Sequence, residues 1–166
     1  MILKQAFLVA GFLAQFDPDW LAVVEADASD HALGGYLSQL DPKMGILHPV
    51  TFYSRKLIGT KEQYEIYNKE MLAIVECLKQ WRVYLSGAAM QMRVFTDHKN
   101  LEYFTTMKVL NKRQAQWAEE LAKYNFIIIY YIETLNMKAN LLSYRANYFP
   151  KKGEAIIVKP LLLYPE

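Results

Sequence analysis

The sequence predicts a mixed α/β fold in which helices flank a five-stranded sheet. Three short apolar or alternating segments follow one another through short loops, which is typical of an antiparallel meander. Two further segments of this kind each follow a helical pattern, and strand–helix–strand connections favour parallel pairing. The chain has 166 residues, 53% of them apolar, enough to bury a core within a single domain. We therefore expect three antiparallel strands and then two parallel ones.

The three leading strands are predicted from their side-chain patterns. Residues 21–25 form an apolar run that continues to Asp27, the pattern of a buried strand with a carboxylate at its tip. Residues 34–39 begin with two glycines, which predicts a strand with a bulge or bend. Residues 48–54 alternate apolar and polar side chains, as a strand does. Ahead of these strands, residues 2–14 are predicted to form a short helix.

A long amphipathic helix is the clearest predicted element. Apolar side chains recur at steps of three and four over about six turns and mark one face. Thr60 and Gln63 have capping-box spacing at its start, and Ser86-Gly87 is expected to end it. The apolar positions are Tyr64, Tyr67, Met71, Ile74, Leu78, Trp81 and Leu85.

The second half of the chain alternates strands with helices. A fourth strand ends on Asp97, and a fifth is rich in isoleucine and tyrosine, which suits a buried strand. The tail from Pro150 lacks helical period. The predicted strands are residues 91–96 and 126–132, and the predicted helices are residues 99–107, 112–124 and 136–145.

Composition excludes several classes of protein. The content of apolar and charged residues excludes disordered, collagen-like and low-complexity chains. A single cysteine, Cys77, excludes a disulfide framework and a cysteine-rich zinc site, and we expect it to be a small buried residue. The net charge of +2, from 19 basic and 17 acidic residues, neither indicates nor excludes nucleic-acid binding.

No apolar run is long enough to span a membrane. The longest, residues 6–14 and 126–132, fall short of the roughly 20 residues that a spanning helix needs. The first run follows Lys4 and fits either a secretory signal or a helix that packs one face. We expect the helix, and an intracellular protein without a membrane partner.

Three carboxylates lie where the predicted elements bring them together. Asp27 and Asp97 each end a strand, and Glu70 lies mid-helix beside the apolar stripe. Close carboxylates raise one another's pKa unless a cation joins them. Their hard oxygens suit magnesium or manganese, and such clusters hold two ions about 4 Å apart for phosphoryl chemistry. Each residue also fits a structural role: Asp27 in a turn, Glu70 paired with a lysine, Asp97 as a helix cap.

Long motifs resemble the RNase H domain of gypsy-type LTR retrotransposon polyproteins. They include VEADASDHALGGYLSQ at 24–39, HPVTFYSRKL at 48–57 and EQYEIYNKEMLAIVECLKQWRVYL at 62–85. VFTDHKNLEYF at 94–104 and LNKRQAQWAEEL at 110–121 follow in the same order and spacing. The resemblance implies an RNase H fold and two-metal hydrolysis of the RNA strand of RNA–DNA hybrids.

The resemblance also implies which residues hold the ions. The family's catalytic set is three aspartates and a glutamate. Its first two aspartates fall on Asp27 and Asp97, and its glutamate falls on Glu70. The fourth position, an aspartate in the family, is Asn140 here. Asparagine keeps a ligand oxygen but loses the charge, so the magnesium or manganese ion nearest Asn140 is expected to bind weakly.

Departures from the family pattern leave two functions open. Besides Asn140, residues 131–134 read YIET where the family has arginine, proline and glycine, and Tyr144 replaces an arginine. Asn140 alone would fit an engineered substitution, but several departures indicate relaxed selection or another task. The first hypothesis is a weakened ribonuclease H. The second is an inactive, domesticated RNase H-like module that binds nucleic acid or a protein partner.

Nucleic-acid contacts and partners follow from the same reading. Candidate phosphate or ribose contacts are Ser29, Lys99, Asn100, Lys112 and Arg113, with Gln39 a further candidate by position. Each basic residue also fits an ordinary solvated face. His98 either shuttles protons beside Asp97 or has a structural role.

We expect residues 1–19 to end a connection to a reverse transcriptase domain, 20–148 to form the RNase H-like domain and 149–166 to form a tail.

Overall fold

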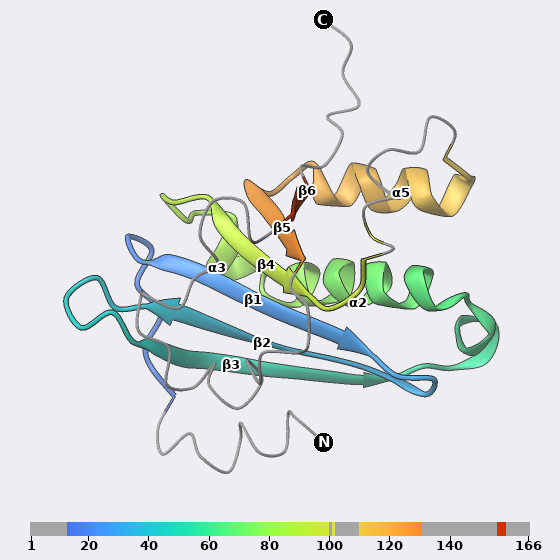
Figure 1. The fold of residues 1–166 in the computed structure, drawn as a ribbon, viewed down its shortest axis with the longest axis horizontal. Coiled ribbons are helices and arrows are strands. Elements are labelled where there is room, and N and C mark those ends of the chain that lie inside the picture. Colours follow the sequence, from blue (N-terminus) through green and yellow to red (C-terminus); the bar gives the residue numbers. More distant parts are fainter. Residues whose placement is uncertain (1–12, 100, 102–109, 131–155, 159–166) are drawn as a thin grey trace, which may run out of the picture.

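The computed structural model describes residues 13–99, 101, 110–130 and 156–158. Its sheet has the strand order β3-β2-β1-β4-β5-β6 (Figure 1). The strands are β1 (Leu21–Ala28), β2 (Ala32–Leu40), β3 (Leu47–Lys56), β4 (Met92–Thr96), β5 (Phe126–Tyr130) and β6 (Ile156–Val158). The described helices are η1 (Gly59–Gln63), α2 (Ile66–Gln80), α3 (Arg82–Leu85) and α5 (Lys112–Leu121).

Strand pairing confirms the predicted meander and parallel pair. β2 lies antiparallel to both β1 and β3, whereas β4 lies parallel to both β1 and β5. A sixth strand was not predicted: β6, from the tail, pairs antiparallel with β5. Its three residues are too few to carry a period of their own, so only pairing with β5 defines it.

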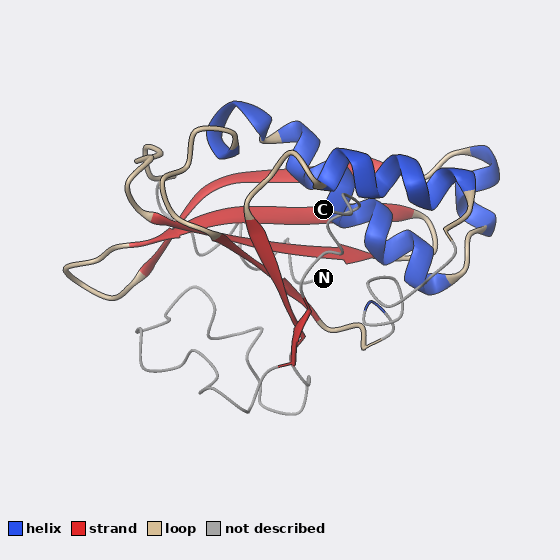
Figure 2. Cartoon of the chain, turned by 90° about the horizontal axis from the view of Figure 1, so that it is seen from above, coloured by secondary structure: helices blue, strands red, loops and turns tan. Residues whose placement is uncertain are grey.

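The helices cover one face of the sheet (Figure 2). Alternate residues of β1 face α2, as the two-residue repeat of a strand requires. They are Ala22, Val24, Ala26 and Ala28, and they join one buried cluster with Met71, Ile74, Val75, Cys77 and Leu78 of α2. This cluster is the main core.

Gly35 allows α2 to lie close to β2. A Cβ at this position would lie 2.5 Å from Cys77 Sγ and 2.8 Å from the Glu25 carbonyl oxygen, so any larger residue would force the two elements apart. Cys77 is buried as predicted, and burial raises the pKa of its thiol to about 12.

Two of the intervening residues of β1, Val23 and Glu25, are buried on the opposite face. Val23 joins a second cluster with Tyr36, Phe95 and others. Glu25 is also buried there, and its carboxylate accepts a hydrogen bond of 2.6 Å from the Tyr36 hydroxyl. Burial on both faces explains the near-continuous apolar run in β1.

The long predicted helix is interrupted at both ends. At its start, Thr60 lies within η1 instead of capping α2, and Glu65 precedes α2 without a side-chain cap. The extended backbone of Tyr64 separates the two, so the predicted capping box there is wrong. At its end, Trp81 leaves helical geometry between α2 and α3. The apolar face continues through the buried Trp81 ring and Leu85.

α5 begins where predicted and does carry a capping box. The Asn111 side chain accepts from the Gln114 backbone N–H at 2.9 Å, and the Gln114 side chain accepts from the Asn111 N–H at 3.1 Å. The predicted helices at 2–14, 99–107 and 136–145 lie largely or wholly outside the described residues. No helix in the described part of the chain is long and apolar enough to cross a membrane.

Candidate metal centre at the carboxyl ends of β1 and β4

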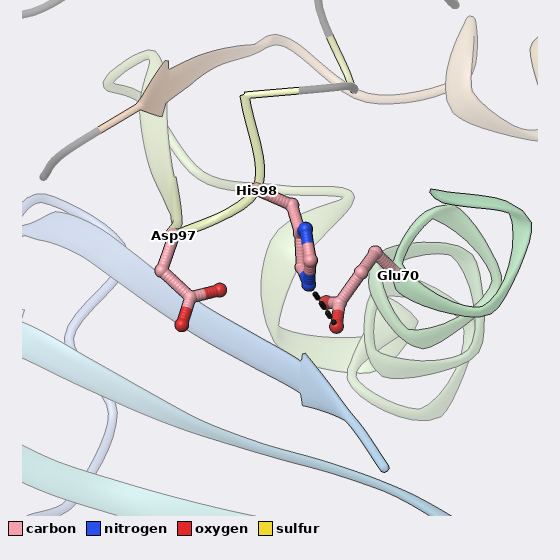
Figure 3. A group of neighbouring side chains, drawn as sticks. All are labelled: Glu70, Asp97 and His98. Atoms are coloured by element: carbon pink, nitrogen blue, oxygen red, sulfur yellow. Dashed lines mark ion pairs between the residues drawn. The ribbon is translucent and has the colours of Figure 1, made fainter. Parts of the chain in front are cut away.

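Three side chains form a cluster at the end of the parallel β1–β4 pair. They are Glu70 of α2 together with Asp97 and His98, which directly follow β4 (Figure 3). One ligand atom from each lies within 4.8 Å of the other two. The sequence analysis predicted that Glu70 and Asp97 would converge, and the structure brings them together.

Glu70 is held at the end of β1 by the backbone. Its side chain is 1% exposed, and Oε1 accepts a hydrogen bond of 3.2 Å from the Ala28 N–H. The neighbouring Lys69, also buried, reaches Asp30 in the β1–β2 turn with Nζ 3.1 Å from Oδ1. These two contacts tie the first turns of α2 to the segment that follows Asp27.

His98 turns its ring toward Glu70. Figure 3 shows the imidazole pointing at the Glu70 carboxylate, and Nε2 lies 3.3 Å from Oε1. The His98 backbone N–H donates to Thr96 Oγ1 at 3.2 Å, which fixes the chain as it leaves β4. The His98 side chain is 32% exposed, so this side of the cluster is open to solvent. The sequence places His98 directly after Asp97, but no sequence pattern indicates its contact with Glu70.

Asp27 lies level with Asp97 on the neighbouring strand. The parallel ladder pairs Val23 with Arg93 and Glu25 with Phe95, and the same offset places Asp27 beside Asp97. Asp27 is exposed and pairs with Gly34 across β1–β2. The three-residue cluster does not include Asp27. The strand register places Asp27 next to this cluster.

Two further candidates have their hydrogen-bonding groups engaged in the fold. The Ser29 hydroxyl closes the β1–β2 turn: it donates to the Ala32 carbonyl at 3.1 Å and accepts from the Ala32 N–H at 3.0 Å. Gln39 is 1% exposed, and its amide bonds the backbone of Asp17 and Trp20. The structure therefore contradicts a ribose-contacting role for Gln39, because no surface of the side chain is left for a ligand.

The basic candidates that the structure describes are exposed. Lys99, Lys112 and Arg113 all face solvent, and the Arg113 guanidinium carbon lies 3.8 Å from the centre of the Tyr64 ring. The first turns of α2 and α5 lie on the same side of the molecule as the carboxyl ends of β1 and β4 (Figure 1). Asn100 and Asn140 lie outside the described residues.

Comparison with known proteins agrees with this geometry. A family model described as the RNase H-like domain found in reverse transcriptase matches residues 17–124. The transposon Tf2-3 polyprotein of Schizosaccharomyces pombe is 37% identical over 145 residues, which cover 85% of this chain and 11% of the polyprotein. The chain therefore spans about a tenth of that relative's length.

Solved structures share the fold. The foamy viral protease–reverse transcriptase in complex with double-stranded DNA has a TM-score of 0.60 at 20% identity, over 79% of this chain and 27% of that one. LC11-RNase H1 from compost has a TM-score of 0.51 at 14% identity, over 74% of this chain and 91% of that one. The fold, the convergence of Glu70 with Asp97 and the family match agree: this chain belongs to the RNase H-like domains found in reverse transcriptases.

Proposed function

We propose that this domain is a metal-dependent ribonuclease H that hydrolyses the RNA strand of RNA–DNA hybrids, with activity weakened by Asn140. The convergence of the buried Glu70 with Asp97 beside the end of β1 carries the proposal. Two structural neighbours support the substrate class, because foamy viral protease–reverse transcriptase and LC11-RNase H1 have each been solved in complex with an RNA/DNA hybrid.

The residues present fit magnesium or manganese. Glu70 and Asp97 offer hard carboxylate oxygens within one small cluster, and Asp27 lies one strand away at the same level. A carboxylate as buried as Glu70 is costly to ionise unless a positive partner faces it. We propose that Asp27, Glu70, Asp97 and Asn140 together hold two ions. When bound, such ions activate a water and stabilise the leaving oxygen.

The chain's own residues orient this chemistry. The Ala28 N–H donates to Glu70 Oε1, which holds the carboxylate at the end of β1. Asp27 lies in β1, and Asp97 directly follows the adjacent strand β4, so the pairing of these two strands sets the spacing of the two carboxylates. Lys99, Lys112 and Arg113 lie exposed, where they would neutralise phosphates of the hybrid.

An inactive module is the second candidate, and Asn140 favours it. Where the family has a fourth carboxylate, this chain has a neutral amide, so less negative charge faces two divalent cations. In this version the domain binds the hybrid or a protein partner without cutting. In either version we propose that it works inside the cell next to a reverse transcriptase domain of the same polyprotein.

Cleavage of a fluorescent RNA–DNA hybrid tests the proposal. The 166-residue chain and an Asn140→Asp variant are assayed in magnesium and then in manganese. We expect slow cleavage by the parent, faster in manganese, and a large gain in the variant. If neither protein cuts at high manganese but both retain the hybrid in a binding assay, the inactive module is the correct function. If neither protein cuts or retains the hybrid, the ribonuclease and the nucleic-acid-binding module are both wrong, and only an inactive module that binds a protein partner remains.

A further inference from the structure

We propose that His98 is a nitrogen ligand of the cation held by Glu70 and Asp97, and that it makes this site favour a divalent transition-metal ion over magnesium. The inference rests on the proposed metal-dependent function and deepens it. It assigns to His98 a role that neither its sequence position nor the carboxylates alone would indicate.

The spacing of the donor atoms carries the first step. His98 Nε2 lies 3.3 Å from Glu70 Oε1. Two ligands at adjacent positions of an octahedral ion, with bonds of about 2.1 Å, lie about 3 Å apart. The separation therefore matches two donors of one ion after a shift of a few tenths of an ångström. Asp97 completes the set within 4.8 Å, close to the roughly 4.2 Å between opposite ligands of such an ion.

The chemistry of the donors carries the second step. Magnesium prefers oxygen ligands and retains several waters, whereas imidazole suits transition-metal ions. A neutral imidazole presents one lone pair, and here the nitrogen that faces the Glu70 carboxylate is Nε2. A set of one imidazole and two carboxylates gains affinity for manganese through a nitrogen bond that magnesium uses poorly.

The fold fixes His98 in a position to act this way. Its backbone N–H is anchored to Thr96 Oγ1, and its carbonyl accepts from Leu101 at 3.3 Å. The ring remains 32% exposed while its target carboxylate is 1% exposed. Because the two side chains are in contact and the imidazole is the more exposed of the two, an ion that approaches from solvent on this side meets the imidazole beside the buried carboxylate.

Metal binding by the full 166-residue chain tests the inference. The proteins are the parent, His98→Ala, His98→Gln and the control His48→Ala. The His48 ring of the parent lies beside Asp41, outside the proposed site. Circular dichroism checks that each protein is folded. Calorimetry gives the Kd of manganese and of magnesium, and pulsed electron paramagnetic resonance of bound manganese reports a coordinated nitrogen.

The expected result separates the two cations. In the parent and in His48→Ala, bound manganese shows a nitrogen signal, and both His98 variants lose it. The Kd of manganese rises at least about tenfold in His98→Ala, because the loss of even an outer-shell partner of a metal ligand commonly costs about 10- to 100-fold in affinity, while the Kd of magnesium changes less than about twofold. An unchanged manganese-to-magnesium ratio, with the nitrogen signal retained, would overturn the role of His98 alone. If the parent binds neither cation, the metal-dependent function fails as well.

Discussion

Gln39 and Glu70 are equally buried polar residues, each 1% exposed, at opposite ends of β1. Gln39 pairs with Ala22 near the start of the strand. Its amide donates to the carbonyls of Asp17 and Trp20, at 2.6 Å and 3.3 Å, and accepts from the Asp17 N–H at 2.8 Å. Glu70, at the far end, accepts from Ala28 and faces a second carboxylate and an imidazole.

The comparison distinguishes a polar group with a structural role from one for which we propose a functional role. The Gln39 amide is neutral, and its hydrogen bonds go to backbone groups of a neighbouring loop. It therefore has no hydrogen-bonding group left for a ligand. Burying a carboxylate beside another carboxylate costs free energy in the folded protein, because burial and like charge both disfavour the charged form. Such an arrangement is typical of a site that binds cations. Burial alone therefore does not distinguish the two residues, whereas the chemistry of their neighbours does.

The largest expected effect comes from removing the charge of Glu70. Glu70→Gln keeps an oxygen that accepts from Ala28 but removes one anionic ligand. We expect manganese affinity to fall about 100-fold, or about 3 kcal/mol, with no loss in the free energy of unfolding. Calorimetric titration and urea unfolding measure the two quantities. Unchanged affinity would mean that Glu70 is as structural as Gln39.

Gln39→Leu is the opposite experiment. It removes the partners of three backbone groups, and each buried unsatisfied group costs about 1–3 kcal/mol. We expect the free energy of unfolding to fall by about 3 kcal/mol while manganese affinity per folded molecule stays unchanged. A loss of cation binding at full folding would show that the two ends of β1 are coupled.

Gly35→Ala tests the packing on which the Glu70 end depends. The added Cβ meets Cys77 Sγ and the Glu25 carbonyl oxygen, and overpacking of this kind costs about 1–3 kcal/mol. Combining it with Cys77→Ala removes the first contact but leaves the second. The double variant keeps the close contact with the Glu25 carbonyl oxygen, so we expect it to be less stable than Cys77→Ala alone. This difference in the free energy of unfolding should be smaller than the one between Gly35→Ala and the parent, and urea unfolding of the four proteins measures both.

Lys69→Met tests whether the tie to the β1–β2 turn positions the site. Asp30 is 82% exposed, so water replaces the lost pair and the free energy of unfolding changes by less than about 1 kcal/mol. We expect manganese affinity to fall by more than stability does, because the end of β1 is less constrained. Equal, small changes in both would assign Lys69 to the structural group.

The smallest effect concerns Asp41, far from the site in sequence. Backbone N–H groups of Met44 and Lys43, with a smaller contribution from His48, lower the pKa of Asp41 below its ordinary 3.8. The stability it contributes is present above that value and is lost as the pH falls through the lowered pKa. Asp41→Asn should therefore unfold more easily than the parent at pH 6, with the difference shrinking below about pH 4. A difference that is constant with pH would contradict this origin.

Much of the fold could be predicted because its strands carry their own patterns. The continuous apolar run that leads to Asp27 predicts β1, side-chain alternation predicts β3, and the helices between later strands predict parallel pairing. The break at Trp81 could not be predicted, because the apolar period continues through it. β6 is defined by its partner β5, which no local pattern encodes.

The site was predictable in part for the same reason. The positions of Glu70 and Asp97 follow from the register of a helix and a strand. The direction of the His98 ring depends on how the chain leaves β4. The hydrogen bond from the His98 N–H to Thr96 Oγ1 holds the backbone there, and a sequence does not reveal such a contact. The role of Gln39 was mistaken because its position in β2 gives no sign that Asp17 and Trp20 enclose it.

Hybrid cleavage in manganese by Asn140→Asp and by the double variant Asn140→Asp/Glu70→Gln tests whether the carboxyl ends of β1 and β4 form a catalytic metal site. We predict that the single variant cuts the RNA strand and that the double variant loses at least about 100-fold of that rate. Equal cleavage by both proteins would contradict this prediction, because the reaction would then proceed without the buried carboxylate on which the site is built.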